Sequence, residues 1–104
     1  MADHDLVIRN GLLVDGTGAP ARSGVSVAVD GDRITAIGSD DEIGRGRREI
    51  DATGLLITPG FVDIHTHYDG QATWDAQLEP SSPHGVTTVV MGNCGVGFAP
   101  AKPD

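Results

Sequence analysis

Residues 59–69, PGFVDIHTHYD, restrict the possible folds of this chain more than any other stretch of its sequence. A Pro-Gly pair marks a turn, and the apolar run over residues 61–64 then predicts a short strand that is buried on both faces. The strand leads into His65 and His67, which are two residues apart. Because alternate side chains of a strand share a face, both imidazoles are expected to point the same way at the strand's end.

Two neutral imidazoles directed at one point make half of a zinc site, since imidazole is among the ligands that zinc prefers. The spacing alone is equally compatible with two polar residues at a strand end that bind no metal. Asp69 would share the face of His67 if the strand continued. Its carboxylate could orient a histidine by accepting a hydrogen bond, or it could order the loop. His65 and His67 are therefore candidate zinc ligands, and Asp69 is a candidate supporting residue.

A second apolar run, VTTVVM at residues 86–91, is rich in β-branched side chains and predicts another buried strand. About 20 residues separate the two strands, which is the length of a crossover between parallel neighbours. The second strand ends in Gly-Asn-Cys-Gly, so Cys94 is expected at the same edge as His65 and His67. Cys94 is the one cysteine of the chain and could be a metal ligand, a buried filler, a free thiol or a nucleophile. No basic partner is evident beside it, which disfavours the nucleophile.

The connecting segment, residues 68–83, is polar and predicts a loop with one irregular helix. Its aromatic residues, Tyr68 and Trp74, are expected to pack rather than to line a pocket. His84 precedes the second strand and so lies at the end opposite the candidate metal site, where a structural role is expected.

Residues 1–58 predict a small all-β part. Val25, Val27 and Val29 alternate with other residues, which indicates a strand with one buried face. Asp30-Gly31 then predicts a hairpin, and Asn10-Gly11 predicts a turn after a first short strand. His4, close to the start, is expected in solvent.

The composition excludes several classes of function. With 15 acidic and 7 basic residues the chain carries a net charge of −8, which disfavours nucleic acid as a partner. No apolar stretch approaches the ~20 residues of a membrane span. The acidic start, MADHD, is unlike a signal peptide and favours a cytoplasmic location.

Taken in order, a small β part, then GLLITPGFVDIHTHYD, then HGVTTVVMGNCGVGFAP resembles the start of the amidohydrolase superfamily. More narrowly, the sequence is similar to the N-acyl-D-amino-acid deacylases, or D-aminoacylases. Hydantoinases and dihydroorotases share the H-x-H pair, whereas GNCG is more specific to the D-aminoacylases. The resemblance implies an α/β fold, with a β-sandwich portion in residues 1–58. Residues 59–104 would then be the first two strands of a metal-dependent (β/α)8 barrel.

The resemblance also implies functions for particular residues. His65 and His67 match the H-x-H pair of the more exposed metal site, and Cys94 matches the thiolate ligand of the tighter zinc site. Asp69 matches the acid that follows the pair. The implied reaction is zinc-dependent hydrolysis of an N-acyl amide bond by metal-activated water, with a small N-acyl amino acid as substrate. The family takes its proton-transferring aspartate from a later strand, so no catalytic residue is assigned in this chain.

A complete barrel needs roughly 250 residues, so only its first two strands fit here. The chain is therefore expected to be a truncated part of a longer protein, inactive by itself. Two alternatives stay open from the sequence. One is a cyclic amidase of the hydantoinase or dihydroorotase kind, and the other is a non-catalytic, β-rich metal-binding or assembly module. The preferred acyl group and the oligomeric state are not predicted.

Overall fold

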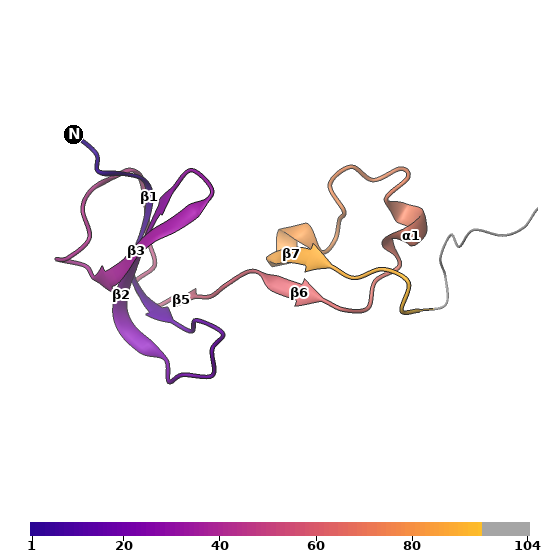
Figure 1. Ribbon diagram of the computed structural model, residues 1–104, viewed down its shortest axis with the longest axis horizontal. Helices are drawn as coiled ribbons and strands as arrows, with labels where there is room; N and C mark the ends of the chain where they lie inside the picture. Colours follow the sequence, from indigo (N-terminus) through magenta and orange to yellow (C-terminus); the bar gives the residue numbers. More distant parts are fainter. Residues whose placement is uncertain (95–104) are drawn as a thin grey trace, which may run out of the picture. The chain divides into compact units, whose positions relative to one another are not determined.

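The computed structural model describes residues 1–94, which are mostly strands with few and short helices (Figure 1). The chain divides after Pro59 into an N-terminal unit, Met1–Pro59, and a C-terminal unit that begins at Gly60. The mixture of a β-rich part and a parallel strand pair agrees with the predicted fold class. Eight barrel strands are not present in residues 1–94, and the barrel therefore stays a prediction. Neither helical segment of this part has the length and apolar character needed to cross a membrane.

The N-terminal unit is built on one five-stranded sheet with the order β3-β2-β1-β4, and β5 also pairs with β1. Its strands are β1 (His4–Leu13), β2 (Arg22–Asp30), β3 (Arg33–Ser39), β4 (Gly46–Asp51) and β5 (Leu56–Ile57). The predicted hairpin is confirmed: β2 and β3 are antiparallel, and Asp30 pairs with Arg33. Gly31 has a φ of 59°, the left-handed conformation that such a tight turn requires.

The predicted turn at Asn10-Gly11 is wrong, because β1 runs without interruption through both residues. The pairing with β2 shifts register between Ile8 and Gly11, and Asn10 has a φ of 56°. The irregularity is thus a bulge within the strand rather than a reversal of the chain. A Cβ on Gly11 would lie 2.5 Å from Cγ1 of Ile57, so only glycine lets β1 approach β5 this closely.

Strand β2 is buried on both of its faces, whereas its alternation predicted one buried face. Val25 and Val27 belong to one core cluster, whose buried members also include Leu13, Ala52 and Ile57. Ala28 points to the opposite face, where it packs with Val7 and Ile43. Ile43 lies in the connection between β3 and β4, so this connection covers the face of β2 that carries Ala28. Alternation in one strand carries no information about such a distant segment.

Polar side chains hold that connection in place. The Arg9 guanidinium donates to the carbonyl oxygens of Ile43 and Gly44, and it pairs with Glu49 at 2.8 Å and with Asp40 at 3.1 Å. The Glu49 carboxylate is the main reason that the pKa of Arg9 is raised. Because Arg9 stays charged, it fixes the backbone on both sides of the buried Ile43 side chain.

His4 is half-buried rather than in solvent, and its Nδ1 lies 2.9 Å from Oδ2 of Asp30. The Thr35 hydroxyl, and then His4, hold the pKa of Asp30 down at about 2, below the roughly 3.9 of an unfolded chain. A lowered pKa in the folded state stabilises the unit above pH ~4, and this contribution is lost as the pH falls toward 2. Asp30→Asn should therefore flatten the pH dependence of the melting temperature between pH 4 and 2. Thermal melts of the chain measure this.

Asp32→Asn is the matched control, because Asp32 lies exposed in the same turn. Its melting temperature should keep the wild-type dependence on pH. An Asp30→Asn chain that loses stability in acid as steeply as the wild type would contradict the assignment to Asp30.

The C-terminal unit contains the predicted parallel strand pair, β6 (Phe61–Asp63) and β7 (Val86–Val89), which lie side by side in Figure 1. The segment between them holds α1 (Tyr68–Gln71) and the 3₁₀ helix η1 (Ser82–His84), in agreement with the predicted loop and irregular helix. The prediction of strands buried on both faces is wrong for the part of the chain that is described. Phe61 is 59% exposed and Val62 58% exposed, because two strands and two single-turn helices are too small to cover both faces.

Candidate metal centre

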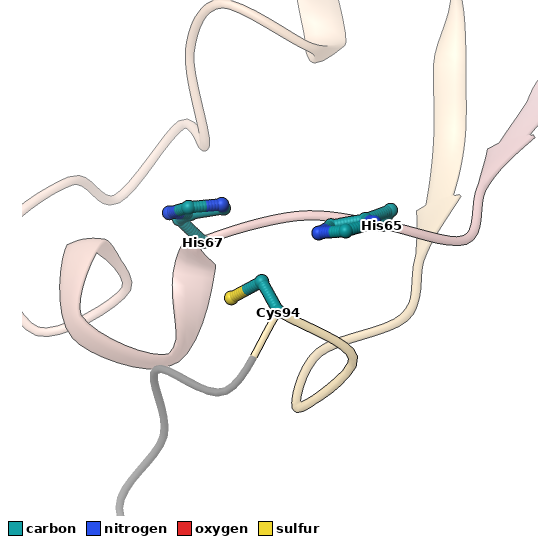
Figure 2. A group of neighbouring side chains, drawn as sticks. All are labelled: His65, His67 and Cys94. Carbon is teal, nitrogen blue, oxygen red and sulfur yellow. The ribbon is translucent and has the colours of Figure 1, made fainter.

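His65 and His67 follow β6 and face the same side, as strand-like alternation predicts (Figure 2). Their ring centroids are 6.0 Å apart and their planes differ by 16°, so the rings are nearly parallel. Thr66, between them, is buried, and its hydroxyl donates to the carbonyl oxygen of Val90 at 3.0 Å. Because the Thr66 side chain points inward, the side chains of His65 and His67 on either side of it point outward and are exposed.

Cys94 comes to the same place from the loop after β7 (Figure 2). One ligand atom from each of His65, His67 and Cys94 can be chosen so that all lie within 4.8 Å of one another. In a tetrahedral zinc site, ligand atoms at roughly 2.0–2.3 Å from the ion are about 3.5 Å apart. The three side chains are thus already gathered, and an inward movement of about 1 Å would let them share one ion.

The donor set suits zinc. Two imidazoles and a thiolate are ligands that zinc accepts, and three protein ligands leave one position of a tetrahedron open. A depression of about 220 Å³ lies beside the two imidazoles. Its lining residues are Asp63, His65, Thr66, His67, Tyr68, Gln71, Pro80 and Ser81. The residues present therefore fit a zinc ion with a fourth, exchangeable ligand.

The loop that carries Cys94 is joined to the histidine segment by hydrogen bonds. The side-chain amide of Asn93 donates to the carbonyl oxygen of Ile64, and the backbone N–H of Gly92 donates to Oδ1 of Asp69 at 3.2 Å. Gly92 takes the left-handed conformation, with a φ of 90°. Asn93 contributes through its side chain.

The supporting acids also have defined partners. Asp69 lies in the first turn of α1, and the hydrogen bond from Gly92 gives it the loop-ordering arrangement of the two that were considered. Asp63 accepts a hydrogen bond from the backbone N–H of His65 at 3.1 Å. His84 lies in η1, before β7 begins, and so at the other end of the strand from Cys94.

The two aromatic residues of the connecting segment differ. Tyr68 packs as expected: it is 3% exposed, and its hydroxyl donates to the carbonyl oxygen of Leu78 at 2.7 Å. Trp74 is 75% exposed, so the packing prediction is wrong for it within residues 1–94. The hydrogen bond from Tyr68 to Leu78 fixes the loop that follows α1, and Tyr68 also lines the depression.

The parallel strands β6 and β7 bring His65, His67 and Cys94 together after their carboxyl ends, in a group that could hold a metal ion. Comparison with protein families makes this specific. The model of the family described as "Amidohydrolase family" matches residues 48–104, which is more than half of the chain. The chain belongs to the amidohydrolase family.

Among its relatives are deacylases of N-acyl-D-amino acids. An N-acyl-D-aspartate deacylase of Alcaligenes xylosoxydans xylosoxydans is 46% identical over 99 residues, covering 95% of this chain and 20% of the relative. A D-aminoacylase of the same organism is 43% identical over 96 residues, covering 92% and 19%. The chain thus spans about a fifth of the length of these relatives.

Solved structures agree with the fold. The N-acyl-D-glutamate deacylase of Bordetella bronchiseptica, solved with zinc and a phosphonate inhibitor, matches with a TM-score of 0.81 at 41% identity, over 94% of this chain and 20% of that one. A D-aminoacylase structure matches with a TM-score of 0.82 at 42% identity, over 97% and 22%. The chain therefore has the fold of one region of these proteins.

Proposed function

We propose that this chain supplies three metal ligands to a zinc-dependent amidohydrolase that deacylates N-acyl-D-amino acids. The observation that carries the proposal is the gathering of His65, His67 and Cys94, from two parallel strands, into a cluster less than 5 Å across. The names of the relatives supply the substrate class. In the same proposal residues 1–58 are part of a β-sandwich, and β6 and β7 begin a (β/α)8 barrel.

Each of these residues has a defined part in the proposal. His65 and His67 bind through ring nitrogens, and Cys94 binds as a thiolate, which neutralises part of the ion's charge. Zinc in such a site supplies Lewis-acid polarisation of an amide carbonyl and a water nucleophile active at neutral pH. Thr66 and Asp63 orient the histidine segment through their hydrogen bonds. The proposal assigns proton transfer to an aspartate from a later barrel strand, so we expect this chain to be catalytically inactive by itself.

The experiment that tests the function uses the whole protein that carries this sequence. Purified protein should release the free amino acid from N-acetyl-D-amino acids and should leave the L-enantiomers and a hydantoin intact. Removing the metal with a chelator should abolish the release, and added zinc should restore it. Hydrolysis of the hydantoin without hydrolysis of the N-acetyl-D-amino acids would replace the proposal with the cyclic amidase. No hydrolysis of either, with zinc still bound, would favour a non-catalytic metal-binding module.

A further inference from the structure

The peptide group between Ile64 and His65 is held from both sides, and the contact that holds its carbonyl comes from the cysteine loop. Its N–H donates to the carboxylate of Asp63 at 3.1 Å, and its carbonyl oxygen accepts the side-chain amide of Asn93. A peptide group with both polar atoms bound cannot rotate without losing one of them. The orientation of this group sets the direction of the His65 side chain.

The same contact acts close to two candidate ligands at once. Asn93 is the residue next to Cys94, and Ile64 is the residue next to His65. One side-chain hydrogen bond therefore joins the immediate neighbours of a thiolate and an imidazole. The bond from Gly92 to Asp69 makes a second connection, near His67.

Hydrogen bonds of Val90 also join the two chain segments, at a point before the cysteine loop begins. The backbone N–H of Val90 donates to the carbonyl oxygen of Asp63 at 2.8 Å, and Thr66 donates to the carbonyl oxygen of Val90 at 3.0 Å. Strand β7 ends at Val89, and Gly92 and Asn93 in the loop beyond it are exposed. The contacts made by Gly92 and Asn93 join this loop to the histidine segment.

We propose that Asn93 is a positioning residue of the metal centre, and this inference rests on the proposed metal site. Its amide holds the Cys94 loop against the peptide group of His65 and so sets the separation between sulfur and imidazole. Two atoms bound to one zinc ion lie at most about 4.5 Å apart, given bond lengths of roughly 2.0–2.3 Å. Ligand atoms that lie within 4.8 Å of one another are therefore close to this limit, and a small displacement of the sulfur decides whether it can bind. Without this amide the loop would keep the bond from Gly92 to Asp69 but lose its contact with the His65 peptide group, so the sulfur would move away from the histidine pair.

The test is a cobalt titration of the chain and two variants, because cobalt(II) substitutes for zinc and reports its ligands by absorption. Binding to a thiolate gives a charge-transfer band in the near ultraviolet that binding to imidazoles alone does not give. Asn93→Ala should weaken cobalt binding about tenfold, the lower end of the range for residues that orient ligands. At saturation its charge-transfer band per bound cobalt should also fall, which a loss of folding stability alone would not cause.

Asn93→Asp separates positioning from electrostatics, because the two change cobalt affinity in opposite directions. The substitution keeps the size of the side chain and removes the N–H donor to Ile64. It also adds a negative charge close to the cation, which by electrostatics alone should tighten binding. If positioning dominates, Asn93→Asp binds cobalt more weakly than the wild type, and tighter binding overturns the inference.

Ser82→Ala is the matched control, since it removes a side-chain donor to a backbone carbonyl, that of Gln77, in the same unit but away from the loop. It should leave both the affinity and the charge-transfer band unchanged. A wild-type chain that binds cobalt without a charge-transfer band would overturn the Cys94 ligand itself, and with it the proposed metal site. A wild-type band that both Asn93 variants retain at full strength and affinity would overturn the positioning role alone.

Discussion

Cys94→Ala should weaken zinc binding to this chain by about 100-fold or more. Zinc held by four protein ligands binds with roughly 10–16 kcal/mol, which is about 3 kcal/mol for each ligand and corresponds to two orders of magnitude in affinity. The loss should be no smaller here, because only His65 and His67 would remain. Competition with a chromophoric chelator at neutral pH measures the two dissociation constants. The far-ultraviolet spectrum of the variant should match that of the wild type, since Cys94 lies after the last described strand.

His84→Ala provides the control for this experiment. His84 lies before β7, at the end opposite Cys94, so its removal should leave the affinity within about twofold of the wild type. The comparison separates a built site from weak binding by any exposed imidazole. A Cys94→Ala chain whose affinity stays within about threefold of the wild type would remove the thiolate from the site. In the whole enzyme, retained zinc and activity would then favour the cyclic amidase.

Short sequence patterns were sufficient to predict those elements whose residues are close together in the chain. Asp30-Gly31 supplied the hairpin between β2 and β3, because the turn and its two strands are contiguous. The spacing of β6 and β7 gave their parallel pairing. The turn predicted at Asn10-Gly11 was wrong because only the local pair was considered. Pairing with β2 on one side and β5 on the other keeps this part of β1 extended.

The candidate site shows the same limit. The spacing of His65 and His67 determined their common direction, and the position of Cys94 after the second strand determined the edge that it reaches. The contacts of Thr66 and Asn93 could not be read in this way, because they depend on the register between β6 and β7. Alternation alone would have turned Thr66 inward, but it could not name Val90 as the acceptor. A residue type predicts a ligand more readily than it predicts the residue that orients a ligand.

Gly46→Ala should be the most destabilising small substitution in the N-terminal unit. A Cβ on Gly46 would lie 2.6 Å from the carbonyl oxygen of Arg48 and 2.8 Å from the backbone nitrogen of Val7. Both are backbone atoms, and Val7 is completely buried in the core, so neither can move aside cheaply. Separating β4 from β1 to admit the methyl group should lower the free energy of unfolding by about 3 kcal/mol, the upper part of the usual range for overpacking.

That loss should appear as a fall of about 12 °C or more in the melting temperature, at 4–8 °C for each kcal/mol in a unit of roughly this size. Gly38→Ala is the control: its Cβ would approach only Oε2 of Glu42 within 3.4 Å, at 2.8 Å, and a carboxylate at the end of a flexible side chain can rotate away. Its cost should stay below about 1 kcal/mol, the value of the hydrogen bond that Glu42 would give up with Ser39. Equal melting temperatures for the two variants would mean that β1 and β4 are not packed as closely as the structure describes. The difference therefore measures the contact between these two strands directly, independently of any metal.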